Sequence, residues 1–268
     1  MNPFEKVAVG IKTFLRDAKL VKAINGIISN IPGAQIIIAD DGEQTHEKSE
    51  LYADLVRKGH KVGVYSFDSG FGFKSNQIVN MLDRPYLLIG SDDFDFTLEA
   101  ASGVKAMIEI MEESHPGELD ILSGRLNGRT YEFNLEDRGD TIIEHKADTN
   151  FKMMGKRPRV YLVGLTVNYS LIRREVFDKV KFDNEEIIGE GGHGAFFVDC
   201  KRAGLKVGFT PLAEISEQTE PPDSERYRKF RARANSPSRK TFDKRGIKKY
   251  VLGSGAVDYD CSHKILPS

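Results

Sequence analysis

Short apolar runs alternate with amphipathic segments along residues 6–97. The apolar runs predict strands, and apolar residues at helical spacing predict helices between them. The predicted strands are 6–13, 35–39, 61–66 and 86–89, and the predicted helices are 17–29, 47–58 and 73–82. Strands that alternate with helices form a mostly parallel sheet. The pattern therefore predicts an α/β fold with a Rossmann-like, doubly wound sheet.

The pattern changes after a predicted helix at 98–114. Residues 120–125 and 131–135 are expected to form antiparallel strands, and a polar stretch follows through residue 148. Further expected elements are a strand at 160–169, a helical turn at 173–178, a helix at 194–203 and a strand at 206–210. These features indicate a smaller antiparallel sheet. We expect one domain at 1–219, with halves 1–97 and 98–219, followed by an irregular, basic arm at 220–268.

Charged residues follow the predicted parallel strands directly. Lys12 ends the first strand, Asp40 and Asp41 follow the second, and Asp92, Asp93 and Asp95 follow the strand at 86–89. The carboxyl ends of parallel strands meet at one edge of a sheet, so these side chains should line one crevice. Adjacent carboxylates repel by about 1 kcal/mol at contact in water. A divalent cation that bridges to a diphosphate would relieve this repulsion, and a solvated acidic turn is the alternative.

Composition and charge narrow the class of protein. Apolar residues make up 40% of the chain and charged residues 29%, and no apolar window is long enough for a membrane span. Residues 1–6 do not resemble a secretory signal, so we expect a cytoplasmic protein. The two cysteines, Cys200 and Cys261, are too few for a disulfide scaffold and are interpreted as ordinary thiols.

The net charge of the whole chain is −1, but one segment is strongly basic. Between Arg226 and Lys249 there are eleven Lys or Arg residues and one acid, Asp243, with interspersed aromatic residues. Such a segment can follow a phosphate backbone, or it can be a solvated tail or close over a diphosphate.

Several motifs together resemble family 2 glycosyltransferases of the GT-A fold, most of all the β-1,4-N-acetylgalactosaminyltransferases of ganglioside synthesis. The first half contributes VAVGIKTFLR at 7–16, IIIADDG at 36–42 and YLLIGSDDFDF at 86–96. The second half contributes VNYSLIR at 167–173 and AGLKVGFTP at 203–211. The resemblance extends over residues 6–217 and implies a GT-A fold with a nucleotide-sugar-binding half and an acceptor half.

The resemblance implies a donor site for a UDP-sugar with Mn²⁺ or Mg²⁺. Asp40 and Asp41 would hold the base and ribose, with Lys12 nearby. Residues 72–76 (GFKSN) occupy the place of the family's Gly-Arg-Asn helix start. Ser75 replaces the Arg of that motif, so Lys74 would supply the positive charge, and Asn76 keeps the motif's Asn. Lys74 as a solvated surface residue is the alternative.

The resemblance also implies a metal site. Ser91-Asp92-Asp93 matches the Asp-x-Asp motif without its first acid, which assigns Asp93 to the metal and Asp92 to the donor sugar or ribose. Asp95 is a reserve ligand or a surface acid. Glu217, with Glu214 close by, stands near the place where relatives often have a histidine ligand. It would complete the metal site. The alternative is that Glu217 is a polar surface residue.

The sequence departs from the family at the catalytic base. The family's Asp would fall on Ala195, within GEGGHGAFF at 189–197. An inverting transfer needs a group that accepts the acceptor's proton, and Glu190 and His193 are the nearby candidates.

The leading hypothesis is a metal-dependent, inverting hexosyltransferase that acts on a hydroxyl of a saccharide or lipid-linked acceptor. The alternatives are a transferase for hydroxymethylated bases in phage DNA, bound through the basic segment 226–249, an inactive sugar-nucleotide-binding protein, and a nucleotidyltransferase.

Overall fold

The structure is a computed structural model that describes residues 2–129, 133–146, 160–186, 192–232, 238–255 and 257–260. Of residues 192, 193, 238, 239 and 257–260, the backbone alone is described.

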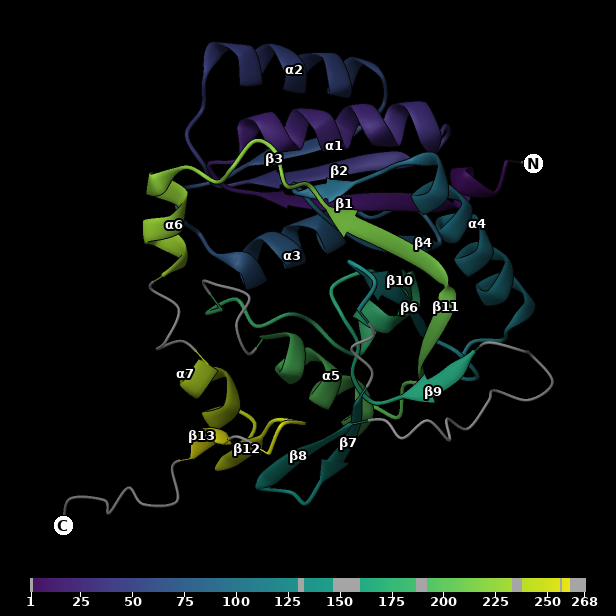
Figure 1. Cartoon of the computed structure of the whole chain (residues 1–268), viewed down its shortest axis with the longest axis vertical. Helices are drawn as coiled ribbons and strands as arrows, with labels where there is room; N and C mark the ends of the chain where they lie inside the picture. The colour runs from purple at the N-terminus through teal and green to yellow at the C-terminus, as the bar shows by residue number, and fades with distance from the viewer. Residues whose placement is uncertain are drawn as a thin grey trace.

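The large sheet begins with four parallel strands in the order β3-β2-β1-β4 (Figure 1). These strands are β1 (Val7–Thr13), β2 (Gln35–Asp40), β3 (Lys61–Val64) and β4 (Tyr86–Ser91). The sheet continues through β10 (Ser170–Arg173), β6 (Ile121–Leu126), β11 (Val207–Glu217) and β5 (Phe94–Asp95), and β9 (Tyr161–Val163) pairs with β11. The predicted fold class, a mostly parallel, doubly wound sheet, is confirmed.

Helices cover both faces of the sheet, because the strands are apolar on both faces. Val7 and Val9 point into one core with α1 (Asp17–Asn30), α2 (His46–Arg57) and α4 (Leu98–Glu113). Ala8 points into a second core with α3 (Phe71–Met81) and α5 (Gly192–Arg202). Burial on both faces is typical of parallel strands joined by helical crossovers. Two short 3₁₀ helices, η1 (Pro3–Lys6) and η2 (Arg174–Asp178), complete this part of the molecule.

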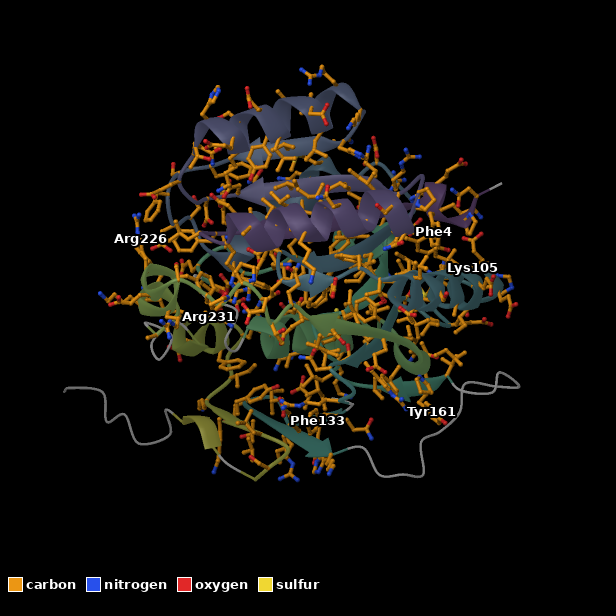
Figure 2. All side chains as sticks on the ribbon, turned by 45° about the horizontal axis from the view of Figure 1, so that its top comes forward. Phe4, Lys105, Phe133, Tyr161, Arg226 and Arg231 are labelled. Atoms are coloured by element: carbon orange, nitrogen blue, oxygen red, sulfur yellow. The ribbon has the colours of Figure 1, made fainter. Side chains whose placement is uncertain are left out.

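A second, four-stranded sheet lies below the large one in Figure 1, in the order β13-β12-β8-β7. Its strands are β7 (Phe133–Asp137), β8 (Thr141–Lys146), β12 (Lys249–Val251) and β13 (Val257–Asp260). Figure 2 labels Phe133 at the start of β7. The sheet joins the middle of the chain to its C-terminal part, because β12 runs parallel to β8.

Three expectations for the second half are wrong. Residues 121–126 do not pair with 133–137, since β6 lies in the large sheet and β7 pairs with β8 instead. The expected single strand 160–169 is only the short β9, and a separate strand, β10, begins directly after residue 169. The C-terminal segment is not irregular over its described residues, where it forms α6 (Glu225–Arg231), α7 (Ser238–Asp243) and two strands.

The C-terminal segment is ordered because it contributes to the second core. Phe242, Ile247 and Tyr250 are buried there at 0–1% exposure. The domain boundary at residue 219 remains a prediction. Among the described residues, no helix combines the length and apolar character needed to cross a membrane. Cys200 is a buried free thiol, and Cys261 lies outside the described residues.

Candidate donor-binding site

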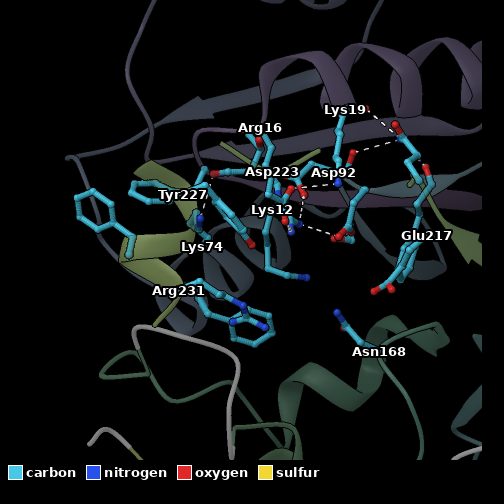
Figure 3. A pocket seen from close by; sticks show the side chains of 18 of the residues that line it. Lys12, Arg16, Lys19, Lys74, Asp92, Asn168, Glu217, Asp223, Tyr227 and Arg231 are labelled. Carbon is cyan, nitrogen blue, oxygen red and sulfur yellow. Dashed lines mark hydrogen bonds and ion pairs between the residues drawn. The ribbon is translucent and has the colours of Figure 1, made fainter. Parts of the chain in front are cut away.

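A cavity of about 500 Å³ opens at the carboxyl ends of β1 and β4 (Figure 3). The first half of the chain supplies Lys12, Thr13, Phe14, Arg16, Lys19, Asp41, Asp68, Phe71, Lys74 and the stretch 91–94. The second half supplies Leu126, Asn168, Glu217, Gln218, Asp223, Tyr227, Phe230 and Arg231. The place fits the general rule that ligands of open α/β sheets bind beyond the carboxyl ends of the strands.

The acidic pair at the end of β4 lines this cavity and is almost fully buried, with Asp92 4% and Asp93 9% exposed. Nη1 of Arg16 lies 2.6 Å from Oδ2 of Asp93 and 3.3 Å from Oδ1 of Asp92, and the Ser91 hydroxyl donates a hydrogen bond to Asp93. Burial raises the pKa of Asp92 to about 6, the charge of Arg16 opposes this change, and the charge of Asp93 adds to it. Burial therefore disfavours the charged form of Asp92, and the guanidinium of Arg16 offsets part of this effect.

The donor set at the acidic pair suits a divalent metal only in part. Carboxylate oxygens are the ligands that Mg²⁺ and Mn²⁺ prefer, and Mg²⁺ is commonly held by one or two carboxylates together with substrate phosphates. The described residues contain no group of three His, Cys, Asp or Glu side chains arranged to hold a metal. Asp92 and Asp93 would therefore hold an ion only together with oxygens from a bound diphosphate or water.

Two lysines also line the cavity: Lys74 is buried, and Lys12 is half-buried on β1 next to the end of β4. Nζ of Lys74 lies 2.5 Å from Oδ1 of Asp41 and 3.0 Å from the carbonyl oxygen of Thr13. Nζ of Lys12 lies 4.9 Å from the ring centre of Phe71. Burial, with the neighbouring charge of Lys74, lowers the pKa of Lys12 to about 8. Burial also raises the pKa of Asp41, although the ammonium of Lys74 acts against this change.

Asp40 and Asn76 do not line the cavity. Hydrogen bonds and ion pairs with other residues hold their side chains elsewhere. Oδ2 of Asp40, which is completely buried, accepts a hydrogen bond from the Tyr52 hydroxyl at 2.8 Å and pairs with Lys48 at 3.0 Å. The Asn76 side chain donates to the carbonyl of Phe182 at 2.8 Å and accepts from its backbone N–H at 3.1 Å. Asp40 thus holds α2, and Asn76 holds the chain before α5.

The candidates for the catalytic base are mostly beyond the described side chains. Glu190 lies outside the described residues, and for His193 the backbone alone, in the first turn of α5, is described. Ala195 is 1% exposed in the second core and does not line the cavity. Its position is therefore unsuited to the role that the family resemblance gives it.

Glu217, the second predicted metal ligand, is on the cavity wall. Its Oε2 accepts a hydrogen bond from the Asn127 side chain at 2.9 Å, and its backbone N–H donates to Asn127 at 2.8 Å. Figure 3 shows the side chains of Lys12, Asn168 and Arg231 pointing into the open centre of the cavity, with Glu217 across from them. The role of Glu217 as a metal ligand remains a prediction.

The structure adds residues that the sequence did not single out. The guanidinium of Arg16 also lies 2.7 Å from Asp223 and 3.9 Å from the ring centre of Tyr227, and Lys19 lies 3.0 Å from Asp223. Arg16 follows β1 as the acids follow β4, so the rule of strand ends would have found it. Asp223 and Tyr227 carry no local signal, because tertiary packing alone brings them here.

The short helix α6 forms one wall of the cavity. The ring of Phe230 lies 5.2 Å from that of Phe14 and 5.5 Å from that of Phe67, and Arg226 pairs with Glu43 at 2.7 Å. Arg226 and Arg231, labelled in Figure 2, mark the ends of this helix. One part of the basic segment therefore lines the cavity, and its expected closure over a diphosphate remains a prediction.

Comparisons with known proteins agree with this arrangement, although no family model matches the chain. The chain is 28% identical over 240 residues to β-1,4 N-acetylgalactosaminyltransferase 2 of Mus musculus, which covers 86% of this chain and 44% of that protein. It is 24% identical over 212 residues to β-1,4 N-acetylgalactosaminyltransferase 1 of Homo sapiens, over 75% of this chain and 37% of that protein. The chain thus spans less than half the length of these curated relatives.

Two solved structures share the fold. GalNAc-T7, crystallised with UDP, GalNAc and Mn²⁺, superposes with a TM-score of 0.61 at 16% identity, over 85% of this chain and 47% of that one. TarS 1-349 of S. aureus superposes with a TM-score of 0.54 at 13% identity, over 90% of this chain and 71% of that one. The fold is that of the GT-A glycosyltransferases. Within this fold the chain is similar to the β-1,4-N-acetylgalactosaminyltransferases, the group that its sequence motifs resemble.

Proposed function

We propose that this protein is a metal-dependent, inverting glycosyltransferase that moves a hexose from a UDP-sugar to a hydroxyl of a saccharide acceptor. The observation that carries the proposal is the convergence of Asp92 and Asp93 with Lys12 and Lys74 in one cavity at the strand ends. Support comes from the named activity of the curated relatives and from the UDP and Mn²⁺ in the GalNAc-T7 structure. The cytoplasmic location expected from the sequence remains a prediction.

The charges in the cavity suit a sugar diphosphate. Buried ammonium groups stabilise phosphate oxygens more strongly than exposed ones, because water screens them less. Lys12 would face the diphosphate directly, while Asp41 keeps Lys74 at the cavity wall. A Mn²⁺ or Mg²⁺ ion bound at Asp93 would neutralise charge that develops on the leaving diphosphate. Asp92, one residue away, would bind the donor sugar or ribose.

In this proposal, Glu190 or His193 removes the proton from the acceptor hydroxyl. A carboxylate or imidazole can accept that proton when it lies within hydrogen-bond reach of the acceptor. The burial of Ala195 in the core favours a second candidate function, an inactive protein that binds the sugar nucleotide without transferring it. Release of UDP distinguishes the two functions, since the inactive protein would bind the donor and leave it intact.

A DNA acceptor receives little support. Acidic partners within the chain neutralise much of the basic segment, and the described pairs are Arg226–Glu43, Lys229–Glu225, Lys244–Asp183, Arg245–Asp199 and Lys248–Asp140. A phosphate backbone would have to compete with these carboxylates. DNA binding would also weaken steeply with added salt, so salt-independent or absent binding removes this alternative.

The central experiment compares Asp93→Asn with Asp95→Asn by calorimetric titration of UDP in the presence of Mn²⁺. The first variant removes the charge proposed to hold the ion and should weaken metal-dependent UDP binding by tenfold or more, about 1.4 kcal/mol. Asp95 pairs with Lys22 outside the cavity lining, so its variant should bind like the wild type. Equal affinities for both variants, or no metal-dependent binding by the wild type, would contradict the proposal. A panel of UDP-sugars then identifies the donor by UDP release.

A further inference from the structure

Arg16 is a buried cation with two sets of anionic partners. One nitrogen, Nη1, contacts Asp92 and Asp93, while the other, Nη2, contacts Asp223 at 2.7 Å. The guanidinium also stacks on Tyr227, and 13% of the side chain is exposed. A single side chain therefore connects the acids at the end of β4 with the segment that contains α6.

A guanidinium and a metal ion compete for the same carboxylate of Asp93. The guanidinium cannot withdraw by losing its proton, because an arginine side chain stays protonated in proteins. It must move away from Asp93 for an ion to bind there. Two anions remain for it after such a move: Asp223, which it already holds, and the diphosphate that arrives with the ion.

We propose that Arg16 is the resident counter-ion of Asp92 and Asp93, that a metal–nucleotide complex displaces it from Asp93, and that this exchange shifts the segment 223–231. The inference rests on the proposed function, because it requires a divalent ion and a nucleoside diphosphate at this site. Arg16 thereby becomes a positioning residue that links occupation of the donor site to the α6 wall.

The first test measures binding of Mn²⁺ alone, without nucleotide, by calorimetry. Arg16→Gln removes the competing cation and should bind Mn²⁺ about tenfold more tightly than the wild type. Arg16→Lys keeps a positive charge and should stay near the wild-type affinity. The matched control is Lys22→Gln, which removes a cation from α1, the helix that begins directly after Arg16; Lys22 pairs with Asp95 at 3.3 Å and is half exposed.

The second test follows the α6 segment by fluorescence. The chain contains no tryptophan, so Tyr227→Trp provides a single reporter on the ring against which Arg16 stacks. Addition of UDP with Mn²⁺ should change the emission, because the guanidinium leaves or turns on that ring. The same addition should leave the emission of Tyr227→Trp/Arg16→Gln nearly unchanged, although that double variant still binds Mn²⁺.

The outcomes separate the inference from the proposed function. Wild-type protein that binds Mn²⁺ and UDP, with an Arg16→Gln variant of equal or weaker Mn²⁺ affinity, overturns the inference and leaves the function standing. An emission change of equal size in both reporter proteins also overturns it. If folded wild-type protein and all variants fail to bind UDP in the presence of Mn²⁺, the function and the inference fail together.

Discussion

At the scale of single residues, Lys12 makes the proposed donor site sensitive to pH. Its ammonium is buried beside Lys74, and this environment lowers its pKa to about 8. The protonated form attracts a diphosphate, so the affinity for UDP should fall as the pH rises through about 8, by at most tenfold per pH unit. Titrations of UDP with Mg²⁺ at intervals of about half a pH unit, between about pH 6.5 and 9.5, measure how the affinity changes with pH.

The same shift affects stability with the opposite sign. Between about 8 and 10.5, the unfolded chain keeps a proton on Lys12 that the folded protein has lost, so this residue makes folding more favourable as the pH rises through that window. Lys12→Met removes the charge at similar size. This variant should bind UDP more weakly at pH 7 and lack the slope above pH 8, whereas an unchanged slope would assign the titration to another group.

The positions of the strand ends in the sequence predicted which residues lie close together, but not the direction in which each side chain points. Asp40 and Asp41 are neighbours on the chain, yet Asp40 pairs with Lys48 of α2 and Asp41 with Lys74 of α3, on opposite faces of the sheet. Successive side chains of an extended chain alternate in direction, so only one of the two reaches the cavity. The sequence predicted that the two side chains point in opposite directions. It did not predict which face of the sheet carries the cavity.

At the scale of elements, the start of α3 depends on a close approach that only glycine permits. A Cβ on Gly72 would lie 1.7 Å from the carbonyl oxygen of Asp183, and the backbone N–H of Gly72 donates to the carbonyl of Glu186 at 2.9 Å. α3 presents Phe71 and Lys74 to the cavity. The contact with the chain before α5 therefore sets the position of one cavity wall.

We predict that Gly72→Ala destabilises the protein and weakens UDP binding. Alanine favours a helix over glycine by about 1 kcal/mol, so a loss of stability must come from the clash, which typically costs about 1–3 kcal/mol. Urea unfolding and UDP titration measure the two effects. Asn80→Ala, on the exposed side of the same helix, is the control and should change neither quantity appreciably. A stabilised Gly72→Ala variant would show that the 183–186 contact is easily rearranged.

Elements with both faces buried were the ones that the sequence predicted well. Apart from the two-residue strand β5, which was not predicted, the strands and helices of residues 7–113 lie within about two residues of their predicted bounds, because apolar residues there recur with a clear period. The strand at 207–217 was predicted to end at 210, before Pro211. Proline lacks a donor, and β11 continues past it through an irregularity in the pairing between Phe209 and Glu214.

At the scale of the whole molecule, the C-terminal segment is part of the fold. Phe242 and Ile247 stand singly among polar and charged residues, so no periodic pattern indicated that they are buried. Tyr250 of β12 lies 4.7 Å from the ring centre of Phe242, and its hydroxyl donates to Glu144 of β8 at 2.7 Å. These contacts join the C-terminal segment to β8 and to the second core.

Tyr250→Ala tests whether the C-terminal segment and the rest of the chain unfold together. Truncation of a large buried aromatic side chain commonly costs about 3–5 kcal/mol, and at 1% exposure Tyr250 should lie in that range. A single, cooperative urea transition should move to lower denaturant, because α5 shares this core with β12. Tyr250→Phe is the matched control, which removes the hydrogen bond alone and should cost roughly 1 kcal/mol. A separate early transition, with the main transition unmoved, would instead identify residues 220–268 as an independent arm.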